Sequence, residues 1–101
     1  MTNLMESLMT SERGDIIKED GNVYRLSIYG RGEHLFFREN DKGLLCHIDA
    51  VHGAIFKKSI HIWDSTGEKM SKAEKERVSE LIFKYYKKFY NPNVIWVDKF
   101  C

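Results

Sequence analysis

Short apolar runs alternate with turn-forming residues over positions 16 to 62 of the chain. This pattern is typical of an antiparallel sheet whose strands are joined by hairpins. In the second run, Tyr24, Leu26 and Ile28 alternate with Arg25 and Ser27. Because successive strand side chains point to opposite faces, the first three residues are expected on the core side. The expected strands cover residues 16–19, 22–29, 34–40, 44–51 and, less regularly, 54–63.

The turns between these runs have recognisable chemistry. Asp20-Gly21 is the clearest signal, because a type I′ turn needs positive φ at both central residues and Asp-Gly adopts it at low cost. Further turns are expected at residues 30–32, 40–43 and 52–53. Lys57 and Lys58 interrupt the alternation, so Ser59 is expected in a bulge or a short helical turn.

One main helix is predicted from Ser71 to Tyr90. Ser71 and Glu74 have the spacing of a capping box, in which each side chain accepts a hydrogen bond from the other residue's backbone N–H. An apolar stripe with the spacing of a single buried face follows, made of Val78, Leu81, Ile82, Tyr85 and Phe89. Asn91-Pro92 ends the helix, and residues 93–98 predict a final strand.

Together these elements predict one α+β domain over residues 1–101. It has an antiparallel sheet of about five or six strands packed on one main helix, and a short N-terminal helix is compatible with the apolar residues near the start. A chain of 101 residues with 43% hydrophobic residues suits one domain with a core. The formal charge of +1 excludes neither a protein nor a nucleic-acid partner.

The two cysteines, Cys46 and Cys101, are too few for a disulfide framework. The sequence shows no secretion signal and no run near the roughly 18 apolar residues of a membrane span. We therefore expect a cytoplasmic protein with reduced thiols and no membrane contact.

Candidate catalytic and metal-binding residues are few. Cys46 and His47 are adjacent and point to opposite faces of a strand, so with His52 they make a poor metal site, and Cys46 is expected in the core. His61 and Asp64 have acid–base chemistry, but no nucleophile or second carboxylate is placed to complete a site. We expect no enzyme, metal or cofactor, with a small hydrolase around these two residues as the weakest alternative.

Lysines and aromatic residues interleave from Lys84 to Tyr90, a mixture that can hold phosphates and stack bases. With Tyr85 and Phe89 assigned to the buried stripe, Tyr86 and Tyr90 are expected to remain exposed among the lysines. A small RNA-binding protein using this helix end is therefore the main alternative function. A solvated helix end is the simpler interpretation, and we expect no direct binding of nucleic acid.

A set of positions spread from the second strand to the helix resembles a known group of proteins. It comprises Tyr24, Arg31, Ser59, Ile60, Trp63, Gly67, Ser71, Glu74 and Arg77. On these residues the chain resembles the immunity proteins of bacterial polymorphic-toxin and contact-dependent growth-inhibition systems. The resemblance implies a cytoplasmic protein that binds a cognate toxin domain, such as a tRNA-cleaving nuclease, and blocks its active site or its access to substrate.

Candidate partner-binding residues are the acidic side chains of the expected turns and one tryptophan. Acidic loops would meet a basic, nucleic-acid-binding toxin by charge complementarity, and tryptophan is enriched at binding hot spots. The candidates are Glu33, Glu39, Asp41, Asp49, Trp63, Asp64 and Glu68. The identity of the toxin and the presence of a homodimer stay open at this point.

Overall fold

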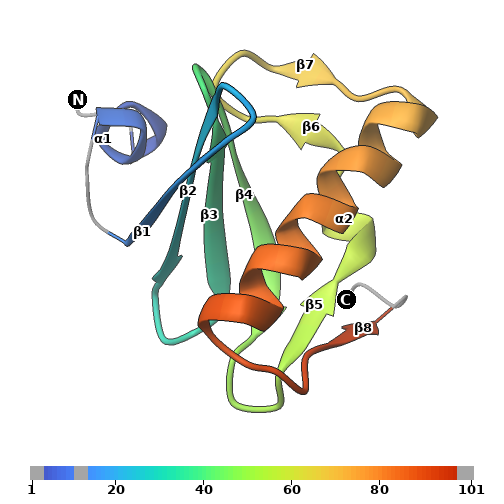
Figure 1. Cartoon of the computed structure of the whole chain (residues 1–101). Coiled ribbons are helices and arrows are strands. Elements are labelled where there is room, and N and C mark those ends of the chain that lie inside the picture. The colour runs from blue at the N-terminus through green and yellow to red at the C-terminus, as the bar shows by residue number, and fades with distance from the viewer. Residues whose placement is uncertain (1–3, 11–13, 98–101) are drawn as a thin grey trace.

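A computed structural model describes residues 4–10 and 14–97 of the chain (Figure 1). Its elements are α1 Leu4–Thr10, β1 Asp15–Glu19, β2 Asn22–Tyr29, β3 His34–Glu39, β4 Lys42–Asp49, β5 Ala54–Phe56, the 3-10 turn η1 Lys57–Ser59, β6 Ile62–Trp63, β7 Glu68–Lys69, α2 Lys72–Phe89 and β8 Ile95–Val97. The short N-terminal helix and the one main helix are therefore present.

Six strands form the main sheet in the order β1-β2-β3-β4-β5-β8. The first four neighbouring pairs are antiparallel, whereas β8 lies parallel to β5. The α+β class and the number of strands are confirmed, with the correction that the last strand joins in parallel. The reason is that α2 carries the chain along the sheet before β8 returns to it, as Figure 1 shows.

The hairpin turns follow the local sequence closely. Asp20 and Gly21 have φ values of 53° and 81°, which confirms the predicted turn. The β3–β4 turn is shorter than the expected turn at residues 40–43, because only Asn40 and Asp41 lie between the two strands. Gly43 belongs to β4 instead, and a Cβ there would come within 3.0 Å of the Phe36 ring.

The expected strand over residues 54–63 is interrupted. It divides into β5, η1 and β6, and its middle is the predicted short helical turn. The Ser59 hydroxyl donates to the Phe56 carbonyl at 2.6 Å and accepts the His47 N–H at 2.9 Å. Ser59 thus fastens η1 to β4.

The main core lies between α2 and one face of the sheet. Leu26, Phe37 and Cys46 are buried there, as expected from the alternation. The buried face of α2 is rotated relative to the predicted stripe, because Tyr86 is 1% exposed while Phe89 is 40% exposed. The residues of α2 that are buried are Val78, Ser79, Ile82, Tyr85 and Tyr86.

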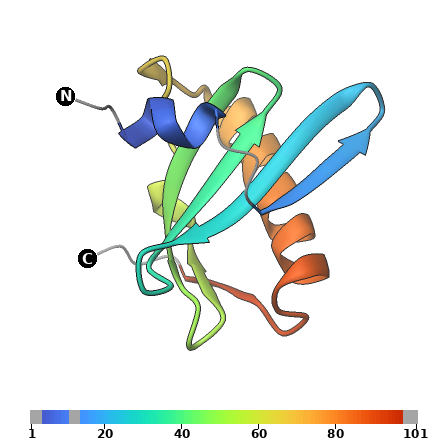
Figure 2. The same ribbon diagram turned by 90° about the vertical axis from the view of Figure 1, so that its left-hand side faces the viewer.

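The opposite face of the sheet is covered by α1, which crosses it on the side away from α2 (Figure 2). Arg25 and Phe36 are fully buried on this face, and the Arg25 guanidinium carbon lies 4.6 Å from the centroid of the Phe36 ring. Arg25 donates to the carbonyl of Leu8, and Arg38 Nη1 donates to that of Met9 at 2.8 Å. Carbonyls at a helix C-terminus lack partners within the helix, so the two arginines hold α1 on the sheet.

Candidate partner-binding surface

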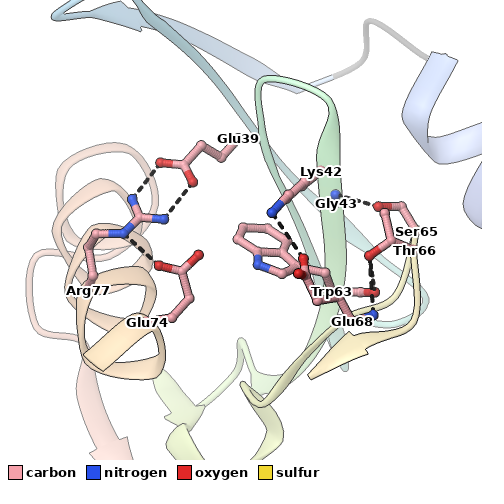
Figure 3. Close-up of polar contacts among 9 residues, drawn as sticks. All are labelled: Glu39, Lys42, Gly43, Trp63, Ser65, Thr66, Glu68, Glu74 and Arg77. Atoms are coloured by element: carbon pink, nitrogen blue, oxygen red, sulfur yellow. Dashed lines mark hydrogen bonds and ion pairs between the residues drawn. The ribbon is translucent and has the colours of Figure 1, made fainter. Parts of the chain in front are cut away.

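Most of the predicted partner-binding residues meet at one end of the sheet. The β3–β4 turn, the β6–β7 hairpin and the start of α2 come together there (Figure 3). The hairpin is fixed to β4 because Ser65 N donates to the Gly43 carbonyl and Gly43 N donates to Ser65 Oγ, both at 3.0 Å. We call this region the acidic end and define it by Glu39, Asp41, Asp64 and Glu68.

Glu33 and Asp49 lie at the opposite end of the sheet. The Glu33 carbonyl accepts the Ile48 N–H at 2.9 Å, which places both residues beside the β2–β3 and β4–β5 turns. Asp49 Oδ2 lies 2.7 Å from His52 Nδ1, and this hydrogen bond holds the pKa of the Asp49 carboxyl below its ordinary value. The seven candidates therefore do not form one surface.

Trp63, one of the candidate partner-binding residues, is part of the core and has almost no surface to offer a partner. Its side chain is 1% exposed, and its ring is stacked near that of Phe37 with centroids 6.4 Å apart. Lys42 Nζ lies over the indole ring, 5.9 Å from its centroid. The Trp63 side chain on the short β6 strand points into the core, so it packs beneath the acidic end and is not part of its surface.

Glu39 is held in an ion-pair network. Its carboxylate oxygens accept hydrogen bonds from Arg77 Nη1 and Nη2 at 2.7 and 2.8 Å, and its side chain is only 12% exposed. Arg77 Nε also donates to Glu74 Oε1 at 2.9 Å, which lowers the pKa of Glu74. Glu39 therefore ties β3 to α2 and offers little of its charge to a partner.

The predicted capping box forms in one direction. Ser71 Oγ accepts the Glu74 N–H at 3.1 Å, as expected for the N-cap residue, which precedes the first residue of the helix. The Glu74 carboxylate binds Arg77 rather than reaching back to Ser71. The ionic contact with a neighbour one turn along the helix has replaced the second half of the box.

Three carboxylates of the acidic end reach solvent. Asp41 is exposed in the β3–β4 turn, and Glu68 pairs with Lys42 at 3.0 Å while its side chain stays 59% exposed. Asp64 is also exposed, but its Oδ2 accepts the Leu45 N–H at 2.8 Å. Asp64 thus has a structural bond as well as a surface charge.

A cleft of about 290 Å³ lies beside Glu68, one of these three carboxylates. Its lining mixes acidic and basic side chains, with Lys42 and Lys69 near Glu68 and Glu74. This size is at the lower end of small-molecule sites. The mixture of charges is better suited to contact with a protein surface than to enclosing a ligand of one sign.

The other candidate catalytic and metal-binding residues do not come together in one site. Cys46 is fully buried, and burial raises the pKa of its thiol to about 12, so the reactive thiolate does not form at neutral pH. His61 is exposed, whereas Asp64 is directed to the backbone of β4. Across residues 4–10 and 14–97, no three His, Cys, Asp or Glu side chains are grouped to hold a metal ion.

The lysine-rich end of α2 differs from the prediction. Tyr86 is buried, and the Tyr90 hydroxyl donates to the Leu26 carbonyl at 3.1 Å. Phe89 is the exposed aromatic residue, with Lys88 Nζ 5.5 Å from its ring centroid. Because Tyr86 follows Ile82 by four residues, the helical spacing already contained the signal for its burial.

Comparison with models of protein families, with curated proteins and with solved structures gave no match to this chain. In the part of the chain that the structure describes, no helix is both long enough and apolar enough to cross a membrane. The resemblance to toxin-immunity proteins therefore stays a prediction from the sequence.

Proposed function

We propose that this chain is an immunity protein that binds and neutralises a cognate bacterial toxin domain through its acidic end. The supporting observation is that Asp41 in the β3–β4 turn and Asp64 and Glu68 in the β6–β7 hairpin are all exposed at one end of the sheet. A nuclease toxin has a basic surface for its nucleic-acid substrate, and an acidic protein surface is complementary to it. Binding there covers the active site or denies access to the substrate.

The acidic end is well suited to recognition because it is held in place before binding. Asp64 is bonded to Leu45 N, Ser65 is bonded to Gly43, and Glu68 is paired with Lys42. Each bond joins the β6–β7 hairpin to β4. A surface that is already ordered loses less conformational entropy on binding.

Charge reversal tests this proposal. Asp41→Lys combined with Glu68→Lys should slow association with the toxin domain encoded beside this gene by about tenfold at low salt, because charges at the rim of an interface act mainly on the association rate. Glu33→Lys at the opposite end is the control and should leave the rate within about twofold. Protection of toxin-sensitive cells and stopped-flow association kinetics provide the two readouts.

The proposal fails if the wild-type protein neither protects cells nor binds the neighbouring toxin. It also fails if Glu33→Lys slows association as much as the double reversal does. Circular dichroism of each variant checks that the fold is retained. Asp64 is left unchanged in this test because its bond to Leu45 also supports the fold.

A second candidate function is RNA binding at the end of α2. Phe89 supplies an exposed ring beside Lys87 and Lys88, which is the combination that stacks bases and contacts phosphates. Salt separates the two functions, because phosphate contacts release counterions and log K falls linearly with log salt. RNA binding that weakens steeply with salt and is lost in Phe89→Ala, without toxin binding, would favour this candidate.

A further inference from the structure

A second groove, of about 260 Å³, lies between η1 and the first half of α2. It shares no lining residue with the cleft at the acidic end. Its floor includes the buried residues Ile60 and Ser79, and its rim includes Lys58, His61 and Lys75. We call it the basic groove and define it by these five residues.

The rim of the basic groove concentrates positive charge. Lys58 and Lys75 are exposed, and no ion pair involving either lysine occurs within residues 4–10 and 14–97. The exposed His61 adds a ring nitrogen that can donate a hydrogen bond. Lys57 and Glu76 also line the groove, and they pair with each other at 3.5 Å, so the charge of Glu76 is offset by Lys57 and not by Lys58 or Lys75. Like charges that gather without a carboxylate partner repel one another, so an anion in the groove would relieve this repulsion.

The helix contributes to the same potential. α2 begins at Lys72, so Lys75 lies in its first turn, where the partial positive charge of the helix dipole is felt. Lys58 reaches the groove from η1, an element that is separated from α2 by the β6–β7 hairpin. Two independent elements therefore bring cationic groups to one small depression.

We propose that the basic groove binds the phosphate group of a phosphorylated ligand. Phosphate has three or more strong acceptor oxygens and up to two negative charges, so it can engage three donors at once, whereas a carboxylate has two oxygens. Lysine binds phosphate as a mobile point charge and does not require the fixed fork of arginine. The groove is small, so it takes a phosphate group and leaves the remainder of the ligand outside.

NMR chemical-shift titration of the full chain tests this site. The probes are inorganic phosphate, a ribonucleoside 5′-monophosphate and a short single-stranded RNA, with ionic strength held constant by chloride. Saturable shifts are expected at the amides of Lys58, His61 and Lys75. Tighter binding of the nucleotide identifies a free phosphorylated molecule as the ligand, and tighter binding of the RNA at the same amides identifies a phosphodiester chain.

Matched substitutions locate the contact. Lys58→Gln combined with Lys75→Gln should raise the Kd for phosphate at least about tenfold, because two charge-assisted contacts are lost. Lys18→Gln combined with Arg31→Gln removes the same charge from exposed positions on β1 and the β2–β3 turn, and should change Kd by less than about twofold. All four residues are exposed, and thermal unfolding checks that the variants fold.

Three results would overturn the phosphate site. The first is shifts that chloride alone reproduces, and the second is an equal loss of binding in both double variants. The third is RNA that shifts Lys87 to Phe89 and leaves the groove unchanged. None of these measurements involves a toxin, so their outcome is independent of whether the chain is an immunity protein.

Discussion

Arg77 on α2 binds both carboxylate oxygens of Glu39, a residue 38 positions earlier at the end of β3. The bidentate geometry fixes the angle between the two groups as well as their distance. Arg77 also forms an ion pair with Glu74, which lies one turn earlier on the same helix. One guanidinium therefore sets where the start of α2 lies relative to the β3–β4 turn.

Arg77→Gln should reduce the free energy of unfolding by about 1 kcal/mol at pH 7. The figure is modest because the Arg77 side chain is 45% exposed and its ion pairs are screened by water. Arg31→Gln is the control, since it removes the same charge from an exposed turn. Urea unfolding of the two variants measures the difference, and equal stability of both would show that the network contributes nothing.

Acid should remove part of this effect. The pKa of Glu74 is lowered, chiefly by its hydrogen bond with Arg77, from an ordinary value of 4.5. The stabilisation is therefore present above about pH 4.5 and is lost as the pH falls through the lower folded-state pKa. Unfolding curves at pH 7 and pH 3 should show the gap between wild type and Arg77→Gln narrowing at the acidic value. A gap that widens in acid would contradict this assignment.

Ile82 and Leu81 should differ in their importance to the core. Ile82 is fully buried between α2 and the sheet, so Ile82→Ala should cost about 2 to 5 kcal/mol. Leu81 is only partly buried, and Leu81→Ala should cost about half as much. Chemical denaturation of the two variants tests this order. A larger loss for Leu81 would contradict this orientation of α2 on the sheet.

Substitutions at Asp64 and Asp41 should differ in their effect on stability, because Asp64 makes a structural hydrogen bond and Asp41 contributes only a surface charge. Asp64→Ala leaves the Leu45 N–H without its side-chain acceptor and should cost about 1 to 2 kcal/mol. Asp41→Ala removes an exposed charge and should change stability by less than about 0.5 kcal/mol. Urea unfolding measures both, and Asp64→Asn should recover part of the loss because its amide oxygen can still accept the bond.

Cys46 should be inert in the folded protein. In a Cys101→Ser background, a thiol reagent at pH 8 should modify Cys46 only after denaturant is added, because burial both shields the sulfur and raises the pKa of its thiol to about 12. Absorbance of the released reagent gives the rate. Rapid modification without denaturant would show that β4 opens readily under native conditions.

Local signals predicted the hairpins because they depend on neighbouring residues. Asp20-Gly21 needs no distant contact to favour its turn, and Ser71 caps a helix that begins immediately after it. The alternation also placed Arg25 on the correct face of β2. It could not predict that Arg25 is buried, because α1 covers that face through contacts between residues far apart in sequence.

The sequence was sufficient to predict which acidic residues are exposed, but not which of the candidates are paired or buried. Acidic residues in and beside the turns, such as Asp41 and Glu68, are recognisable as exposed, and the hairpin geometry brings them to the same end. The capture of Glu39 by Arg77 depends on the packing angle of α2, for which the sequence has no local signal. Trp63 was ambiguous for a similar reason, since a large aromatic residue suits a core and an interface equally well.

The parallel pairing of β8 with β5 affects the order in which the sheet can be built. β1 to β4 pair with their immediate neighbours in sequence, so each hairpin can close soon after its second strand leaves the ribosome. β5 must wait for β8 until η1, β6, β7 and α2 have all been synthesised. Throughout that interval the outer edge of β5 is open, and an open strand edge is where a nascent chain is most easily captured by another one.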